Sequence, residues 1–206
     1  VGGNITRTTG PQTLDVTAIG SVRPRRVLTR SGARPGDEVY VTGSIGDAAV
    51  ALRMLQEGVE TAPGLRDRYL RPQPRVRAGL LLGRNRAATS CMDLSDGLAD
   101  GLRQVAEASG VGMTIDAEAL PLTDEVRAWY ATRGENAVDA ALAAGDDYEL
   151  LFTARASRKG RLRMVRGQLG DLPITRFGVV TRARELRVRE AGRLRDLPLG
   201  FEHFRS

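Results

Sequence analysis

The chain has 206 residues, of which 41% are hydrophobic and 27% charged, so it carries enough apolar side chains for a folded core. One cysteine, Cys91, and one histidine, His203, exclude a disulfide framework and a histidine-rich metal site. The single lysine, Lys159, follows no glycine-rich loop, which excludes a Walker-type P-loop. No apolar run reaches the roughly 18 residues of a membrane span, so no membrane association is expected.

The net charge of +6 comes from an excess of arginine, because all but one of the 31 basic residues are arginines. These arginines are dispersed among acidic residues, as in 66–68, and form no continuous basic tract. Aromatic residues make up 4% of the chain, which provides few platforms for stacking bases. The composition therefore indicates a general arginine bias more strongly than a nucleic-acid surface.

The first part of the chain mixes strand and helix patterns. Residues 1–4 are typical of a strand that runs into a turn, which predicts that the chain starts within a longer protein. Asp47 is expected to cap a helix that Gly58 ends, and Pro74 to lie in the first turn of another. The predicted strands here are 14–22 and 38–42, and the predicted helices run from 47 to 58 and from 74 to 83.

The second part of the chain continues this alternation. Ser95 is expected to cap a helix over 96–109 that Gly110 ends, and Thr123 is expected to cap the next helix. Further predicted helices are 136–144 and 157–169, the predicted strands are 87–92, 111–116 and 148–153, and 174–180 with 186–189 form a predicted β-hairpin. Because helices and strands alternate, the fold class is predicted as mixed α/β or α+β.

Two aspartates and a serine stand where the strand 87–92 gives way to a helix: Asp93, Ser95 and Asp96. A helix N-terminus attracts phosphate, but two carboxylates would repel a phosphate that carries no cation. Magnesium is commonly held by one or two carboxylates together with phosphate oxygens, so a magnesium–nucleotide site accounts for both features. The alternative, which spacing alone favours, is that Ser95 and Asp96 only cap the helix.

A second acidic segment, 145–149, precedes the next predicted strand. Glu149 falls within the apolar strand pattern, where an unpaired carboxylate is costly, so it indicates either a ligand contact or an ion pair. Arg30 lies among small polar residues and has a side chain suited to phosphate, although an arginine-rich chain offers many such positions. Cys91 is expected to be a small buried apolar residue.

Together, these segments resemble the thiamine-monophosphate kinase family, which belongs to the superfamily of aminoimidazole ribonucleotide synthetase. The most specific pair is Asp-Leu-Ser-Asp-Gly at 93–97 with Gly-Asp-Asp-Tyr-Glu-Leu at 145–150. The other matching stretches are 1–6, 28–37, 40–47, 70–72, 120–122 and 200–204, in the family's order along the whole chain.

The resemblance implies transfer of the γ-phosphoryl group of ATP to thiamine monophosphate, giving thiamine diphosphate, with Mg²⁺ as cofactor. Such a transfer depends on positioning and charge neutralisation, so no catalytic nucleophile is assigned. The residues that the resemblance assigns are Asp93, Asp96 and Asn4 to the metal, Gly3, Asn4, Arg30 and Ser95 to the nucleotide, and Glu149 and Phe201 to the thiamine phosphate. Asn4 differs from the aspartate often found at its position, and its amide oxygen is a weaker metal ligand.

For the fold, the resemblance implies an aminoimidazole ribonucleotide synthetase-like C-terminal domain over 26–206, with a mixed sheet flanked by helices. Residues 1–25 would be a remnant strand of the N-terminal ATP-binding domain. The resemblance also implies a cytoplasmic enzyme that is a homodimer at full length, with no nucleic-acid or membrane partner. Two alternatives stay open: another ATP-dependent enzyme of the superfamily, and a basic nucleic-acid-binding module.

Overall fold

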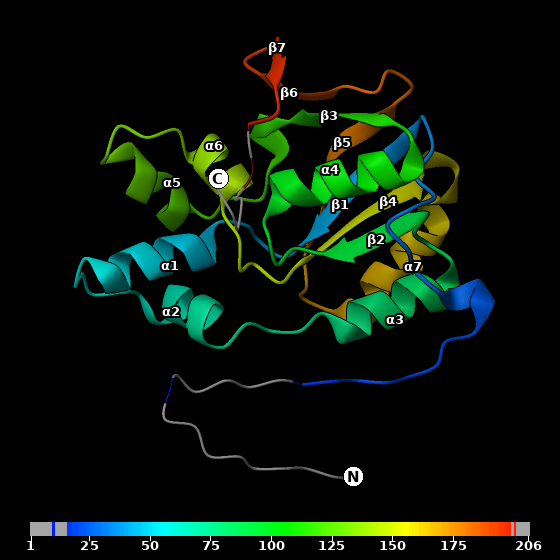
Figure 1. Ribbon diagram of the computed structural model, residues 1–206, viewed down its shortest axis with the longest axis horizontal. Helices are drawn as coiled ribbons and strands as arrows, with labels where there is room; N and C mark the ends of the chain where they lie inside the picture. Colours follow the sequence, from blue (N-terminus) through cyan, green and yellow to red (C-terminus); the bar gives the residue numbers. More distant parts are fainter. Residues whose placement is uncertain (1–9, 11–15, 199, 201–206) are drawn as a thin grey trace.

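The computed structural model describes residue 10, residues 16–198 and residue 200, and these form a helix-covered sheet (Figure 1). The strands are β1 (Asp37–Thr42), β2 (Ser90–Asp93), β3 (Gly112–Asp116), β4 (Leu150–Arg155), β5 (Ile174–Thr181), β6 (Leu186–Glu190) and β7 (Arg193–Asp196). The α-helices are α1 (Asp47–Gln56), α2 (Pro63–Leu70), α3 (Val76–Asn85), α4 (Leu98–Ser109), α5 (Asp124–Ala131), α6 (Ala137–Ala143) and α7 (Lys159–Leu169). Three short 3₁₀ turns are η1 (Pro24–Arg26), η2 (Ala117–Ala119) and η3 (Ala156–Arg158).

The seven strands form one mixed sheet in the order β2-β4-β1-β5-β3-β6-β7. The pair β3–β6 is parallel, and the other neighbours are antiparallel. The predicted mixed sheet flanked by helices is therefore confirmed. No helix in the described ranges combines the length and hydrophobicity that a membrane span needs.

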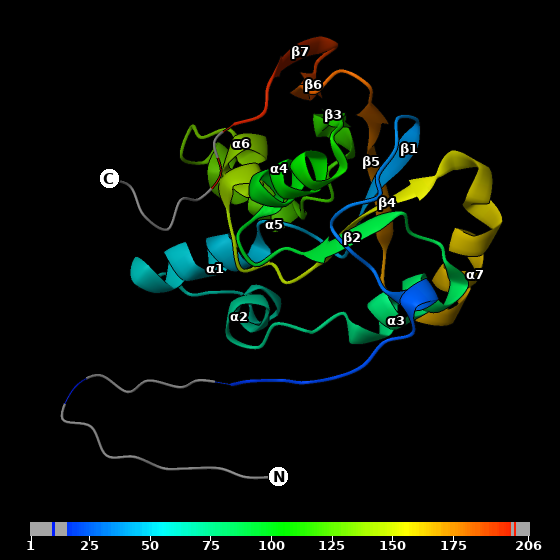
Figure 2. The ribbon, with the colours of Figure 1, turned by 45° about the vertical axis from the view of Figure 1, so that its right-hand side comes forward.

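Helices cover both faces of the sheet, and β1 lies inside it between β4 and β5, with all six residues buried. Because side chains alternate along a strand, Val39 and Val41 contribute to one apolar core, while Tyr40 contributes to the other. The first core includes side chains from α1, α4, α5 and α6, and the second includes side chains from α3 and α7. Figures 1 and 2 show α3 and α7 together, apart from α4.

The predicted strand over 14–22 is wrong for its described part, because residues 16–22 have no regular secondary structure. Val16 and Ile19 are 89% and 95% exposed. The alternating pattern suits a strand, but a strand forms only where another strand can pair with it, and none in the described ranges pairs with this segment.

The predicted β-hairpin of the tail is also wrong. β5 and β6 do form, but β3 lies between them, antiparallel to β5 and parallel to β6. The hairpin that does form joins β6 to β7, with Glu190 opposite Arg193. Ala191 and Gly192 both have positive φ, which matches the right-handed twist of a two-residue hairpin.

The ends of the helices can be compared with the predicted caps. Thr123 caps α5 by accepting a hydrogen bond from the Val126 N–H, and Gly110 ends α4 in a left-handed conformation, so these two predictions are confirmed. The helix predicted over 136–144 forms as α6, and Asn136 lies at its cap position. Asp47 is instead the first residue of α1, and Gly46 holds the cap position. Helix α2 was not predicted, because its sequence lacks an apolar stripe.

Candidate active site

The two acidic segments lie side by side at one edge of the sheet. β2 and β4 pair antiparallel with Asp93 opposite Leu150, so the turn after β2 meets the loop before β4. Three backbone hydrogen bonds join the segments: Leu94 N–H to Glu149 O (2.9 Å), Asp146 N–H to Ser95 O (2.8 Å) and Tyr148 N–H to Leu94 O (2.9 Å). Motifs that are far apart in the sequence therefore form one continuous backbone structure.

Gly97 permits this close approach. Its φ is 94°, and a Cβ at this position would lie 2.2 Å from the Ala144 carbonyl oxygen, so any side chain would clash. The helix consequently begins at Leu98, and no side chain caps it. The prediction that Ser95 caps α4 from Asp96 onward is wrong, because the Gly97 turn separates Ser95 from the first helical residue.

Asp93, Ser95 and Asp96 all lie at the N-terminal end of α4. Asp93 is the last residue of β2 and is exposed, while Ser95 and Asp96 are partly buried in the turn. The N–H groups and the dipole at a helix start favour negatively charged ligands. The turn therefore combines carboxylate oxygens with a position that suits phosphate.

Tyr148 and Asp146 have an unusual backbone in the facing loop. Both have positive φ (50° and 66°), which is uncommon for residues other than glycine and often accompanies functional sites. Burial raises the pKa of the Tyr148 hydroxyl, and the charges of Asp146, Asp93 and Asp96 raise it further. Three carboxylates thus act on one phenol, which stays protonated and able to donate a hydrogen bond.

The donor set of this edge suits a hard cation. Asp93 and Asp96 supply the carboxylate oxygens that magnesium prefers. Among the residues that the structure describes, no group of three histidine, cysteine, aspartate or glutamate side chains is arranged to hold a metal by itself. The residues present therefore fit a magnesium ion whose remaining ligands are phosphate oxygens and water.

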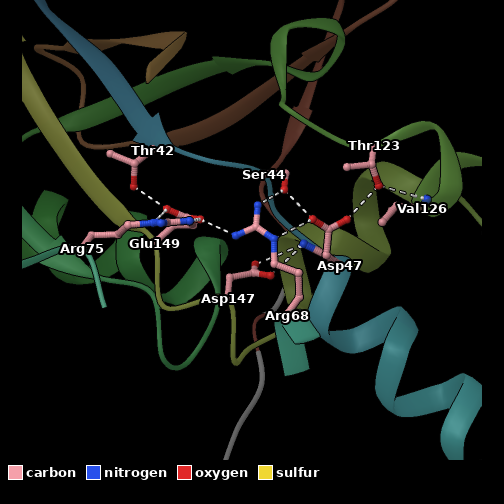
Figure 3. Close-up of polar contacts among 10 residues, drawn as sticks. Thr42, Ser44, Asp47, Arg68, Arg75, Thr123, Val126, Asp147 and Glu149 are labelled. Atoms are coloured by element: carbon pink, nitrogen blue, oxygen red, sulfur yellow. Dashed lines mark hydrogen bonds and ion pairs between the residues drawn. The ribbon is translucent and has the colours of Figure 1, made fainter. Parts of the chain in front are cut away.

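Glu149 lies next to this edge, immediately before β4, and its side chain is 0% exposed (Figure 3). The Arg75 guanidinium donates to both carboxylate oxygens, at 2.7 Å from Nε and 2.6 Å from Nη2. Arg68 donates to Oε1 at 3.0 Å, and the Thr42 hydroxyl donates to Oε2 at 2.6 Å. Of the two roles that the sequence left open for Glu149, the structure shows the ion pair.

The same polar network continues to the start of α1 (Figure 3). Arg68 also donates to the Ser44 hydroxyl at 2.9 Å and approaches Asp47 at 3.6 Å. Asp147 accepts the Gly46 N–H at 2.9 Å. Burial raises the pKa of Asp147 well above its ordinary value, the Gly46 N–H opposes this rise, and the charges of Asp47 and Glu149 add to it.

The Thr29 carbonyl oxygen accepts the Cys91 N–H at 2.8 Å, which places the next residue, Arg30, close to β2. The Arg30 carbonyl oxygen accepts from the Ser109 hydroxyl at 3.4 Å, which places the Arg30 backbone beside the C-terminal end of α4. Asp93, Ser95 and Asp96 lie at the opposite end of this helix, which at 12 residues is about 18 Å long. The Arg30 backbone thus lies beside β2 and the C-terminal end of α4, and its contact with a phosphate bound at the acidic turn stays a prediction.

Other predicted residues can be placed or set aside. Gly3, Asn4 and Phe201 lie outside the described residues. Cys91 is buried as expected, and burial with the nearby Asp93 raises the pKa of its thiol to about 12, so it is no nucleophile at neutral pH.

Nothing in the sequence singles out the partners of Glu149. Arg68 and Arg75 are two of many arginines, and their separation from Glu149 along the chain hides the contact. The only available signal was the cost of a buried carboxylate, which requires a cation without identifying it.

The mixed sheet, with helices on both faces and an acidic strand-to-helix turn at one edge, defines an α/β domain built around a potential phosphate and metal site. Residues 34–189 match the family described as AIR synthase related protein, C-terminal domain. Because the match covers well over half of the sequence, the chain belongs to this family.

Known relatives extend the comparison. The chain is 40% identical over 186 residues to thiamine-monophosphate kinase of Escherichia coli K12, covering 88% of this chain and 55% of that protein. The crystal structure of thiamine-monophosphate kinase from Stenotrophomonas maltophilia K279a is 38% identical, with a TM-score of 0.72 over 81% of this chain and 54% of that one. A structure of AaThiL complexed with AMPPCP and TMP is 32% identical, with a TM-score of 0.70 over 86% and 54% of the two chains. The chain therefore spans about half the length of these relatives.

Proposed function

We propose that this chain is the C-terminal part of a thiamine-monophosphate kinase, which transfers the γ-phosphoryl group of ATP to thiamine monophosphate. The observation that carries the proposal is the junction of the 93–97 turn with the 145–149 loop, held by three backbone hydrogen bonds. The relatives at 32–40% identity carry this name or, in the case of AaThiL, are complexed with AMPPCP and TMP. The product would be thiamine diphosphate.

In this proposal, the residues at the sheet edge act by position and charge. Asp93 and Asp96 would hold Mg²⁺, which when bound neutralises the charge of the transferring phosphate. Ser95 would contact the nucleotide at the N-terminal end of α4, and Arg30 would contact ATP phosphates. No covalent intermediate on the protein is required, so no nucleophile is assigned.

Glu149 would act on the thiamine phosphate together with Phe201. Since Arg75 and Arg68 already donate to its carboxylate, the Glu149 side chain is fixed in orientation. Direct contact with the substrate would require one of these arginines to move. Gly3 and Asn4 would complete the nucleotide–metal site.

The proposal extends to the arrangement of the whole protein. Residues 1–25 would belong to an N-terminal ATP-binding domain and residues 26–206 to the C-terminal domain. The full-length enzyme would be a cytoplasmic homodimer whose partners are the small molecules ATP and thiamine monophosphate.

Asp93→Asn and Asp96→Asn test the proposal in a full-length protein, for example this chain joined to the part of the E. coli relative that it does not span. Each change removes a negative charge from the metal site while keeping the side-chain shape. We expect each to lower thiamine diphosphate formation at least about a hundredfold, because charge neutralisation supplies most of the catalysis. Formation is measured by chromatography of the reaction.

A matched control is Asp100→Asn, in the first turn of the same helix. It should keep most of the activity, and all three variants should unfold at nearly the same temperature as the parent. Near-normal activity in both the Asp93 and Asp96 variants would contradict the proposed metal site. Activity on a different phosphate acceptor, but not on thiamine monophosphate, would favour another ATP-dependent enzyme of the superfamily.

A further inference from the structure

Five arginines surround a hollow of about 470 Å³ between η1 and the end of α3. This hollow, called the arginine groove below, is lined by Pro24 and by Arg23, Arg25, Arg26, Arg84 and Arg86. No acidic residue lines it. Its arginines come from two segments that lie far apart in the sequence, so the positive charge is concentrated by the fold.

The charge of the arginine groove is not neutralised by ion pairs. Among the ion pairs of the described residues, none includes any of its five arginines. By contrast, the buried Glu38 pairs with both Lys159 and Arg176. Elsewhere in the described residues eight arginines form ion pairs with acidic side chains, whereas none of the five groove arginines does.

Further arginines extend this positive region. Arg161 donates to the Arg86 carbonyl oxygen at 3.4 Å, which brings the start of α7 to the groove. Desolvation lowers the pKa of Arg158, and the charges of Arg155, Arg161 and Arg86 lower it further. Like charges are therefore close enough to repel one another, and a ligand with several negative charges would relieve that repulsion.

The groove is built on a fixed contact. The Arg26 N–H donates to the Arg23 carbonyl at 2.8 Å and closes the η1 turn. A Cβ at Gly83 would lie 2.5 Å from the Arg26 carbonyl oxygen, so the glycine allows η1 to pack directly on α3. Figures 1 and 2 show η1 beside α3. The two backbone segments that carry the arginines are therefore held together before any ligand arrives.

A second hollow of about 600 Å³ adjoins the first and shares Arg23, Arg26 and Arg84 with it. Its lining adds apolar side chains, including Val27 and Leu80, which are 48% and 68% exposed. A ligand could therefore place phosphates on the arginines and an apolar group beside them.

We propose that the arginine groove binds a chain of adjacent phosphate groups, either inorganic polyphosphate or the triphosphate of a nucleotide. Guanidinium groups pair with phosphate oxygens through two parallel hydrogen bonds, and several arginines around one hollow match several linked phosphates. Arg86 precedes β2, whereas Asp93 ends it, so this site lies at the opposite end of β2 from the acidic turn. It does not depend on the proposed kinase function.

The test is calorimetric titration of the chain with inorganic tripolyphosphate and with ATP, in 150 mM salt and with EDTA to remove magnesium. We expect both ligands to bind, and monophosphate to bind much more weakly. The Arg25→Gln/Arg84→Gln variant should weaken binding at least about tenfold, since each charged hydrogen bond contributes strongly. Tighter binding of tripolyphosphate would assign the site to inorganic chains, and tighter binding of ATP would assign it to nucleotides.

The matched control is Arg182→Gln/Arg184→Gln, which removes the same charge from exposed arginines of the loop between β5 and β6. It should change the affinity less than about twofold. All proteins should unfold at similar temperatures, which excludes loss of fold. The proposal would be overturned if both double variants weakened binding equally, or if no binding occurred at this salt concentration. It would also be overturned if a short single-stranded RNA bound tenfold tighter than tripolyphosphate.

Discussion

Glu149 and Asp147 lie two residues apart, but their carboxylates have different partners in the fold. Glu149 is fully enclosed, but Arg75, Arg68 and Thr42 satisfy both of its oxygens. Asp147 has one backbone N–H as its strongest partner and faces the charges of Asp47 and Glu149. A buried charge is tolerated where a cation and hydrogen bonds compensate its desolvation, and it is costly where they do not.

Asp147→Asn should therefore stabilise the protein near neutral pH. The folded state raises the pKa of Asp147 above its ordinary value of 3.8. Above pH 3.8 the unfolded chain therefore loses this proton more readily than the folded chain, and the free energy of unfolding falls as the pH rises. Asparagine keeps an oxygen for the Gly46 N–H and carries no charge. We expect a gain of about 1 kcal/mol or more at pH 7.5, measured by urea unfolding.

The stability gain of the Asp147→Asn variant should depend on pH. The gain of the Asp147→Asn variant should shrink as the pH falls towards 4, where the native side chain is protonated. Asp171→Asn, at an exposed position, should change the stability by less than about 0.5 kcal/mol at either pH. A variant less stable than the parent at pH 7.5 would mean that the charged form of Asp147 contributes to the network.

At the scale of elements, α3 and η1 illustrate how one residue fixes the placement of a segment. None of the three residues of η1 is buried. Its position depends on the absence of a side chain at Gly83, which lets its backbone lie against α3. A second glycine of α3, Gly79, has only the Leu150 side chain near its missing Cβ, at 3.8 Å. The two glycines therefore differ in their surroundings within one helix.

Gly83→Ala should displace η1, because the new methyl group would meet the Arg26 carbonyl. We expect a loss of about 1–2 kcal/mol of stability and faster tryptic cleavage after Arg25 and Arg26, while the Arg23–Pro24 bond resists trypsin. Gly79→Ala is the matched control and should stabilise α3 by up to about 1 kcal/mol, because alanine has the higher helix propensity. If both variants gave equal stability and equal cleavage rates, the packing of η1 on α3 would not depend on Gly83.

At the scale of the whole molecule, we expect the proposed kinase site to need residues beyond this chain. The chain spans 55% of the E. coli relative, and its described residues include no group of three side chains that could hold a metal. Val16, Ile19 and Val22 are all exposed in a segment without secondary structure. Exposed apolar residues with a strand-like pattern tend to pair with other chains.

We therefore expect the 206-residue chain alone to form no measurable thiamine diphosphate and to self-associate as its concentration rises. Light scattering after size-exclusion chromatography measures the association, and chromatography of the reaction measures the product. Val16→Ser/Ile19→Ser should reduce the association, and the joined full-length protein should be active. A monomer of this chain that converted thiamine monophosphate at an ordinary enzymatic rate would show that the active site is complete within it.

The sequence by itself determined most of the elements and the acidic motifs. Strand β1, helix α4 beyond its first turn and the Thr123 cap follow from local patterns of apolar residues, caps and turns. The resemblance to the kinase family likewise rested on short contiguous segments such as 93–97 and 145–150. These features depend on neighbours along the chain, which the sequence displays directly.

Only the tertiary structure decided which distant segments meet. The insertion of β3 between β5 and β6, the pairing of Glu149 with Arg75, and the gathering of unpaired arginines around η1 each join residues far apart in sequence. A strand pattern fixes which side chains face the core but not which strand lies beside it. Likewise, a chain with 31 basic residues does not reveal which of them a buried carboxylate will bind, because that choice depends on how the helices pack against the sheet.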